Sequence, residues 1–302
     1  MKLKFGLALN VRERLDEILR LGKMAYEGAI DTLWVVDFPA TRLAPVVASA
    51  IAHELDDMRL GIGLVSPFLH RPKQIVRFIE SLVAQFGDRF DLLLGPGDIS
   101  LLAKVGVEVD FSTLLKRMKT DITTIEEMLQ NLGIRTSVLL GAQGPGLIRL
   151  STMTDGVLLN YSDPKMIEWA MKRLGETSDA FQIGVFPPTF LTEKDDCENH
   201  LGFLISAAIV ALGLNRSISK EFGLEDALAK ARRAVKTKGG VDSEVVEILG
   251  KDTVRMFGLC GSTDETREYV RTLSKIGVDQ IVFGPPLGTE GRQVELLANV
   301  IQ

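Results

Sequence analysis

The feature that most constrains the fold of this chain is a repeated alternation of short apolar segments with helix-like stretches. Eight apolar segments have the length of a strand, and their continuous apolar character is typical of parallel strands covered on both faces. They are residues 4–10, 32–36, 60–65, 90–94, 136–140, 156–159, 182–186 and 280–283. The stretches between them show helical periodicity, so the chain reads as a succession of βα units.

Glycine and proline follow several of these segments. After the fourth segment, Gly95-Pro96-Gly97 continues neither a strand nor a helix, so the chain turns sharply and presents Asp98 just beyond the strand end. Two residues without a Cβ atom also let a flat ligand approach the backbone closely. The same arrangement recurs along the chain, and we expect the strand ends to form one rim where the chemistry takes place.

Eight strands alternating with helices over the whole length predict an α/β fold, a (β/α)8 TIM barrel, as a single domain over residues 1–302. The length suits one barrel of ordinary size. A doubly wound open sheet is the alternative architecture. No Gly-x-Gly-x-x-Gly follows the first strand, which weakens the dinucleotide-binding form of that alternative.

A helical insertion is expected after the seventh strand. Residues from about 194 to 260 exceed what a minimal barrel needs, and we expect them to pack as helices beside it. Gly239-Gly240 marks a break within this zone. The residues expected to be buried there are Ile205, Ile209 and Leu212.

The composition excludes several classes of protein. With 46% hydrophobic and 25% charged residues the chain is globular rather than disordered. A net charge of -5 without a long basic run argues against a nucleic-acid partner. The longest strongly apolar stretch, residues 203–214, is too short to span a bilayer, and the N-terminus has no signal-peptide form. We expect a cytoplasmic protein without a membrane partner, in which Cys197 and Cys260 are reduced thiols.

Polar residues at the ends of the strands are the functional candidates, because this fold gathers them around one mouth. Each of them would also suit a turn or a helix N-cap, so the functional interpretation rests on their convergence. They are Asn10, Asp37, Ser66, Asp98, Gln143, Asn160 and Thr189.

Asp98 is the candidate for acid or base chemistry, since a carboxylate in a water-poor mouth can hold or give a proton. Its alternative role is the N-cap of the segment 99–105. Of the three histidines, His70 is placed near the rim and within reach of a ligand, while His53 and His200 suit helix surfaces or packing. No histidine has a partner at a metal-binding spacing, and no hydrolase or Walker motif occurs.

The segment Gly141-Ala142-Gln143-Gly144-Pro145 leads from the fifth strand into a helix. Backbone amides of a glycine-rich turn at a helix N-terminus form an anion site, so this segment predicts a seat for phosphate. A flexible strand-to-helix turn is the alternative interpretation.

Four segments, in order and at suitable spacing, resemble one family. They are Gly95-Pro96-Gly97-Asp98, Gly141-Ala142-Gln143-Gly144-Pro145, residues 159–165 (LNYSDPK) and Gly284-Pro285-Pro286-Leu287-Gly288. Together they resemble the coenzyme F420-dependent methylenetetrahydromethanopterin reductases of the bacterial-luciferase-like superfamily of TIM barrels. The resemblance covers nearly the whole chain and is weakest from about residue 194 to 260, where this chain is shorter than the family.

The resemblance implies a deazaflavin in the barrel mouth, with FMN as the alternative cofactor. It implies reversible hydride transfer between the reduced deazaflavin and a pterin-bound one-carbon unit, a reaction of one-carbon metabolism and methanogenesis. It also implies a non-prolyl cis peptide behind the ring, at Gly63-Leu64, and the phosphate-bearing tail near the Gly141–Pro145 turn. Asp98 matches the aspartate beside the active site. The residues implied for the cofactor are Asp37, Gly63, Leu64, Val65, Ser66, Gly95, Gly97, Gly141, Ala142, Gln143, Gly144 and Asn160.

Two positions depart from the family. Ala8 stands where the family has a glutamate in the first strand, and Phe38 replaces the histidine of an Asp-His pair after the second. Three hypotheses follow: a reductase acting on a pterin-type substrate, another F420- or FMN-dependent oxidoreductase or monooxygenase on the same fold, or a non-catalytic cofactor-binding homologue. The resemblance also implies a homodimer or larger homo-oligomer.

Overall fold

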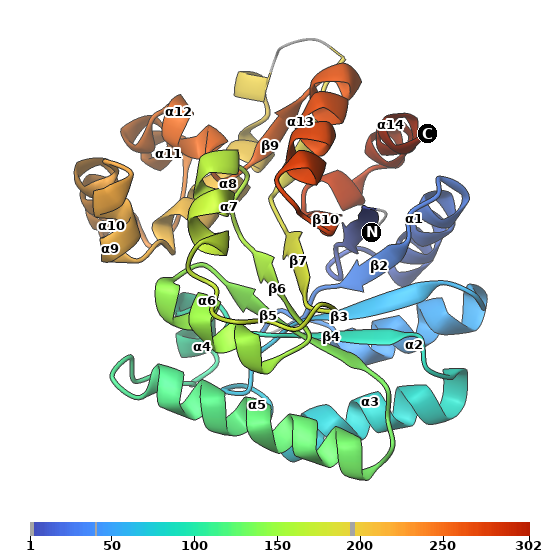
Figure 1. Ribbon diagram of the computed structural model, residues 1–302. Coiled ribbons are helices and arrows are strands. Elements are labelled where there is room, and N and C mark those ends of the chain that lie inside the picture. The colour runs from blue at the N-terminus through green and yellow to red at the C-terminus, as the bar shows by residue number, and fades with distance from the viewer. Residues whose placement is uncertain (1–2, 40, 194–196) are drawn as a thin grey trace.

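A closed barrel of eight parallel strands forms the centre of the molecule in the computed structural model, which describes residues 3–39, 41–193 and 197–302 (Figure 1). The order around the barrel is β1-β10-β7-β6-β5-β4-β3-β2. The strands are β1 (Lys4–Leu9), β2 (Thr32–Val35), β3 (Arg59–Val65), β4 (Phe90–Leu94), β5 (Ser137–Ala142), β6 (Gly156–Leu159), β7 (Gln182–Val185) and β10 (Gln280–Phe283). All eight predicted strands and the (β/α)8 barrel are confirmed, and the open-sheet alternative is excluded.

Helices cover the outside of the barrel, and their apolar stripes form the outer core against the strands. In α3, for example, Ile75, Val76, Ile79 and Leu82 are buried. Among the described residues, no helix is long and apolar enough to cross a bilayer. The helices outside the insertion are α1 (Leu15–Glu27), α2 (Ala44–Glu54), α3 (Pro72–Phe86), α4 (Ile99–Lys104), α5 (Leu114–Asn131), α6 (Pro145–Leu150), α7 (Pro164–Met171), α13 (Thr263–Lys275) and α14 (Gly291–Ile301), with short 3-10 turns η1 (Ser151–Met153) and η3 (Leu287–Thr289). A further 3-10 turn, η2 (Cys197–Asn199), lies inside the insertion.

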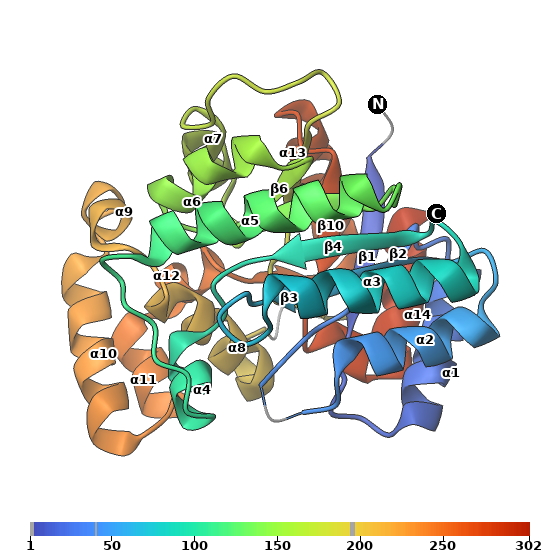
Figure 2. The same ribbon diagram turned by 90° about the horizontal axis from the view of Figure 1, so that it is seen from below.

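The helical insertion predicted after the seventh strand is present between β7 and β10. Figures 1 and 2 show most of them to one side of the barrel. The predicted break is confirmed at Gly239, which ends α10 with a left-handed φ of 79°. The predicted start near residue 194 lies outside the described residues. The helices are α8 (Leu201–Leu212), α9 (Arg216–Glu221), α10 (Glu225–Lys238), α11 (Ser243–Leu249) and α12 (Lys251–Arg255).

The buried face of α8 differs from the prediction. Ile209 is 46% exposed, and Ile205 and Leu212 are only partly buried. The face toward the core is instead made of Phe203, Ala207, Ala208 and Ala211. This helix is apolar on nearly every side, so periodicity does not single out a face. Small residues determine which face is buried. The backbone at Gly258 lies so close to α8 that a Cβ atom there would be 2.8 Å from the Ala207 Cβ.

The expectation of two reduced thiols is wrong for this structure. Cys197 and Cys260 form a disulfide, with their Cα atoms 5.9 Å apart although 63 positions separate them in sequence. The reason is a small parallel sheet that the sequence did not reveal, formed by β8 (Thr189–Leu191) and β9 (Leu259–Gly261). In it Phe190 pairs with Cys260, which brings the end of the helical segment back to its beginning.

The inside of the barrel is filled by a second, separate set of apolar side chains. Trp34 is its largest member and is fully buried. Its indole lies across β3, where a Cβ atom on Gly61 would be only 2.3 Å from the ring, so the strand needs a glycine at that point. The set consists of Ala8, Trp34, Val36, Leu93, Leu139, Leu158 and Val282, with Phe38, Leu64 and Phe186 packed against it.

Glu126 on α5 gives a prediction about stability and pH. One of its carboxyl oxygens is buried without a hydrogen-bond partner among the described residues, and burial, with Asp155 nearby, raises its pKa from 4.5 to about 7. A raised carboxyl pKa lowers the free energy of unfolding as pH rises from 4.5 through 7. We expect Glu126→Gln to stabilise the protein by about 1 kcal/mol at pH 8, after discounting for partial exposure, and much less at pH 5. Urea unfolding at both pH values checks this, and an equal gain at both would contradict it.

Candidate active site

The carboxyl ends of the barrel strands form the mouth, and the end of β3 shapes it. The predicted non-prolyl cis peptide is present between Gly63 and Leu64. The pairing of β3 with β4 shifts register between Gly63 and Val65. Val65 itself is buried on the outer side, in the core between barrel and helices. The irregular strand end thus separates Leu64 from its neighbours and turns it toward the inside.

Leu64 rests on the two glycines of the neighbouring strand ends. A Cβ atom on Gly95 would lie 2.4 Å from Leu64 Cδ1, and a Cβ atom on Gly141 would lie 2.5 Å from the same atom. Distances this short mean that neither position accepts a side chain while Leu64 keeps its place. The glycines therefore make room for Leu64, whose side chain packs against the interior set.

The loops after β3 and β4 are joined at the rim. The Ser66 hydroxyl donates to the Pro96 carbonyl oxygen at 2.8 Å and accepts from the Phe68 amide at 3.2 Å. Gly97 has a φ of 81°, which favours glycine, and a Cβ there would be 3.3 Å from the Ser66 Cβ. The structure therefore brings Ser66, Gly95 and Gly97 together beside Leu64, as the sequence predicted.

Asp98 caps the short helix α4, which is the structural role foreseen for it. One carboxylate oxygen accepts from the amides of Ser100 (2.8 Å) and Leu101 (3.2 Å), and from the Ser100 hydroxyl. Asp98 is exposed, so the water-poor surroundings expected for it are not found in this structure. It stands on the outer rim, and its catalytic role stays a prediction.

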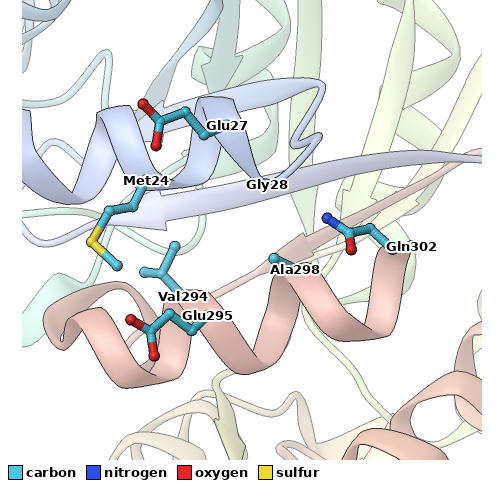
Figure 3. A pocket seen from close by; sticks show the side chains of 7 residues that line it. All are labelled: Met24, Glu27, Gly28, Val294, Glu295, Ala298 and Gln302. Carbon is cyan, nitrogen blue, oxygen red and sulfur yellow. The ribbon is translucent and has the colours of Figure 1, made fainter.

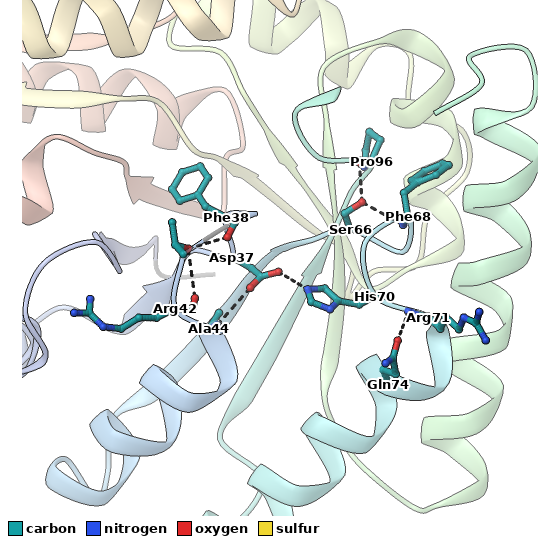
Figure 4. Close-up of polar contacts among 11 residues, drawn as sticks. Asp37, Phe38, Arg42, Ala44, Ser66, Phe68, His70, Arg71, Gln74 and Pro96 are labelled. Atoms are coloured by element: carbon teal, nitrogen blue, oxygen red, sulfur yellow. Dashed lines mark hydrogen bonds and ion pairs between the residues drawn. The ribbon is translucent and has the colours of Figure 1, made fainter. Parts of the chain in front are cut away.

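Asp37 points away from the barrel interior. Its neighbours Val36 and Phe38 belong to the interior set, so alternation along the chain turns Asp37 outward. Figure 4 shows the Asp37 side chain pointing toward His70. Its carboxylate lies 2.8 Å from His70 Nε2 and accepts from the Ala44 amide at 3.4 Å. This partly buried pair joins the chain leading into α2 with the chain leading into α3. His70, predicted to reach a ligand, instead contacts Asp37.

The predicted phosphate turn is shorter than expected. Gly141 and Ala142 belong to β5, which leaves Gln143 and Gly144 as the turn before α6. Pro145 opens that helix and has no N–H to offer an anion. The Gln143 side-chain amide donates to the Val210 carbonyl of α8 at 2.9 Å. The turn thus ties β5 to the helical segment, and its role in holding phosphate stays a prediction.

Two asparagines follow interior residues by two positions and therefore reach the level of the mouth. Asn10 follows Ala8, and its side-chain oxygen accepts from the Arg12 amide in its own loop. Asn160 follows Leu158, and its side chain makes no hydrogen bond within the part of the chain that the structure describes. Asn160 is therefore free to bind a ligand. Thr189, in contrast, lies buried in β8 and donates to the Pro187 carbonyl oxygen.

Phe186 is a mouth residue that our reading of the sequence missed. It follows β7 by one position and packs against the interior set, with its ring 6.4 Å from that of Trp34. Alternation from Gly184 would have placed it inward. Phe38 lies on the same inner side, and the Arg12 guanidinium stands over its ring at 5.4 Å. The interior set consists of apolar side chains, so it can hold a planar apolar ring and exclude water.

A surface pocket of about 300 Å³ lies elsewhere, between α1 and α14 (Figure 3). Met24, Glu27 and Gly28 line it from the end of α1, and residues spread along α14 line the other side. Helix ends of this kind lie at the opposite end of the barrel from the strand termini. Since active sites of this fold lie at the carboxyl ends of the strands, we do not assign the pocket to catalysis.

Comparisons with known proteins agree with this geometry. Residues 3–280 match the family model described as luciferase-like monooxygenase. The chain is 25% identical over 334 aligned positions to 5,10-methylenetetrahydromethanopterin reductase of Archaeoglobus fulgidus, covering 99% of this chain and 98% of that one. The structure of the coenzyme F420-dependent tetrahydromethanopterin reductase from Methanopyrus kandleri superposes with a TM-score of 0.82 at 20% identity, covering 99% and 98%. An F420-dependent secondary alcohol dehydrogenase bound to an F420-acetone adduct gives 0.75 at 12% identity, with the same coverage.

Proposed function

We propose, since the chain belongs to the luciferase-like monooxygenase family, that it is a coenzyme F420-dependent oxidoreductase of the methylenetetrahydromethanopterin reductase type. It would transfer a hydride between reduced deazaflavin and a pterin-bound one-carbon unit. Relatives named as that reductase match over nearly their whole length, which supports an enzyme of this kind. The observation that carries the proposal is the packing of Leu64 against Gly95 and Gly141, where the ends of β3, β4 and β5 meet.

The residues at the mouth fit a deazaflavin. Leu64, together with Phe38 and Phe186, offers an apolar surface for a planar ring. The free amide of Asn160 suits the polar edge of such a ring, and the Gln143-Gly144 turn is the part of the rim that we assign to the phosphate-bearing tail. When bound, the deazaflavin supplies or accepts the hydride, and the protein contributes orientation and the exclusion of water.

The interior favours a one-carbon unit over an alcohol as the partner in hydride transfer. An alcohol loses its hydroxyl proton as its carbon gives up hydride, so that reaction needs a base beside the reacting carbon. A methylene carbon receives the hydride alone, and a proton for the pterin nitrogen can come from the rim. Ala8 and Phe38 supply no such base at the two positions where the resemblance places a glutamate and a histidine. We propose that Asp98, exposed on the rim, handles that proton.

Titration with coenzyme F420 and, separately, with FMN tests the cofactor assignment. We expect micromolar binding of F420, seen as a change in fluorescence, and weaker binding of FMN. Turnover of methylenetetrahydromethanopterin with reduced F420 is the second measurement. Binding of FMN alone would favour a monooxygenase, because only a flavin forms the peroxide adduct with oxygen. Binding of neither would mean that Ala8 and Phe38 accompany a lost cofactor site, and the enzyme proposal would fail.

Three further proposals rest on the same family relation and on composition. We propose that residues 1–302 form one domain, that the protein is cytoplasmic, and that it assembles as a homodimer or larger oligomer. Light scattering during size-exclusion chromatography measures the molar mass, for which one chain contributes 33.1 kDa. A mass of one chain would contradict the oligomer.

A further inference from the structure

A second pocket, of about 270 Å³, lies where the starts of α7 and α13 meet β9. It contains none of the residues assigned above to the cofactor. Its polar lining includes Asp163, Arg255, Glu265 and Tyr269, and its wall also includes Cys260 of the disulfide. A disulfide that lines a pocket can be reached by a small thiol, so the pocket combines a binding surface with a reactive bond.

The two sulfurs of the disulfide are not equally reachable. Cys197 is buried, at 4% exposure, whereas Cys260 is only partly buried and lines the pocket. A nucleophile that enters the pocket therefore meets Cys260, and Cys197 is the leaving group. Opening this bond would remove the covalent link between the two ends of the segment that carries α8–α12.

The charged side chains that line this pocket, within the described ranges, are Arg255, Asp163 and Glu265. Arg255 lies close enough to Glu265 to lower the pKa of that carboxyl group. Glu265 uses one carboxylate oxygen to accept from the amide and hydroxyl of Ser262. Asp163 uses one of its oxygens to accept from the amides of Lys165 and Met166. Each acid therefore keeps a second oxygen that can face a bound ammonium group.

Tyr269 adds a hydrogen-bond donor that has no acceptor in the described structure. Its hydroxyl oxygen is buried and makes no hydrogen bond among the described residues. Burial, followed by the negative charge of Asp163, raises the pKa of this phenol, so it stays a donor. A buried donor left unpaired is costly, and a ligand carboxylate would satisfy it. Arg255 supplies the matching positive charge.

We propose that this pocket binds a small thiol bearing an α-amino acid group, and that the thiol opens the Cys197–Cys260 disulfide by exchange. The ligand carboxylate faces Arg255 and Tyr269, and its ammonium faces Asp163 and Glu265. The ligand thiolate attacks the Cys260 sulfur and forms a mixed disulfide. The original S–S bond breaks, and Cys197 leaves as a thiolate that takes a proton from water. The ligand sulfur is oxidised as the Cys197 sulfur is reduced.

The experiment compares three small thiols on the intact, air-oxidised protein. They are L-cysteine, cysteamine, which lacks the carboxylate, and 3-mercaptopropionate, which lacks the ammonium. Intact mass measured over time gives the rate of adduct formation, expressed per thiolate because the thiols differ in pKa. We expect L-cysteine to react at least tenfold faster than either single-function thiol. Peptide mapping should place the adduct on Cys260.

Two variants test the binding groups. Arg255→Met and Tyr269→Phe should each lower the L-cysteine rate to that of the single-function thiols, while their thermal melting and circular dichroism show folded protein. Equal rates per thiolate for all three thiols on the wild-type protein would overturn the proposal, as would an adduct on Cys197. Two free thiols in the air-oxidised protein would also overturn it. None of these readouts depends on the cofactor or on turnover.

Discussion

Gly95→Ala is expected to weaken deazaflavin binding at least tenfold in a protein that still folds. The added methyl group would meet Leu64 Cδ1 at 2.4 Å and Cγ at 2.8 Å, so Leu64 has to leave its seat. It also lies against β5 at Gly141, so we expect it to move toward the mouth. There it occupies the space we assign to the ring. A tenfold loss of affinity corresponds to about 1.4 kcal/mol.

Overpacking also lowers the free energy of unfolding, by roughly 1–3 kcal/mol. The effect of Gly95→Ala on cofactor affinity therefore has to be distinguished from its effect on stability. Gly202→Ala is the matched control, because a Cβ atom there has no neighbour within 4 Å. The double variant Leu64→Ala, Gly95→Ala removes the clash and should recover the stability lost in the single variant. F420 fluorescence titration and urea unfolding of all four proteins provide the data. Wild-type affinity in a destabilised Gly95→Ala protein would show that Leu64 does not face the cofactor.

The barrel was predictable because its signals are local. The segments 90–94, 156–159 and 280–283 match β4, β6 and β10 residue for residue, since each is a mostly apolar run followed by glycine or a polar residue. Asp163-Pro164 likewise marks the start of α7, where the Asp163 carboxylate accepts from two amides of the first turn. Such features need only neighbours in the chain, so periodicity and turn chemistry are enough to find them.

Contacts between distant parts of the chain were not predictable from such signals. The Asp37–His70 pair joins residues 33 positions apart, and nothing local distinguishes it from two separate loop residues. The Cys197–Cys260 disulfide depends on the pairing of β8 with β9, two three-residue strands too short to give a periodic signal.

In the candidate site, too, features set by local sequence were predictable and contacts between distant residues were not. The positions of Ser66, Gly95 and Gly97 follow from strand ends, and the bond at Gly63-Leu64 followed from the family resemblance. The packing of Leu64 against Gly95 and Gly141 could not be predicted, because it depends on the register between three neighbouring strands. An inward residue such as Phe186 is predicted only if the alternation of side chains is continued one residue beyond the end of the strand. The same alternation of side chains along a strand also predicts that Asp37 points outward.

Trp34→Ala is expected to have the largest effect on stability, a loss of about 3–5 kcal/mol in the free energy of unfolding. The indole is fully buried inside the barrel, and its neighbours Gly6 and Gly61 have no side chains that could move into the space it leaves. The cavity would therefore stay open rather than collapse, which is the condition for the high end of this range. Urea unfolding followed by circular dichroism measures the loss without relying on tryptophan fluorescence.

The other tryptophan provides the control for this prediction. Trp169 lies on α7 in the outer layer, 8% exposed, with the Arg173 guanidinium over its ring at 3.9 Å. Its surroundings include flexible side chains that can close over an alanine, so Trp169→Ala should cost clearly less than Trp34→Ala. Gly61→Ala should be destabilising as well, because its Cβ would lie 2.3 Å from the Trp34 ring, and combining it with Trp34→Ala should cost less than the sum of the two. Equal losses for the two tryptophan variants, or strict additivity at positions 34 and 61, would mean that Trp34 is not what fills the barrel beneath the mouth.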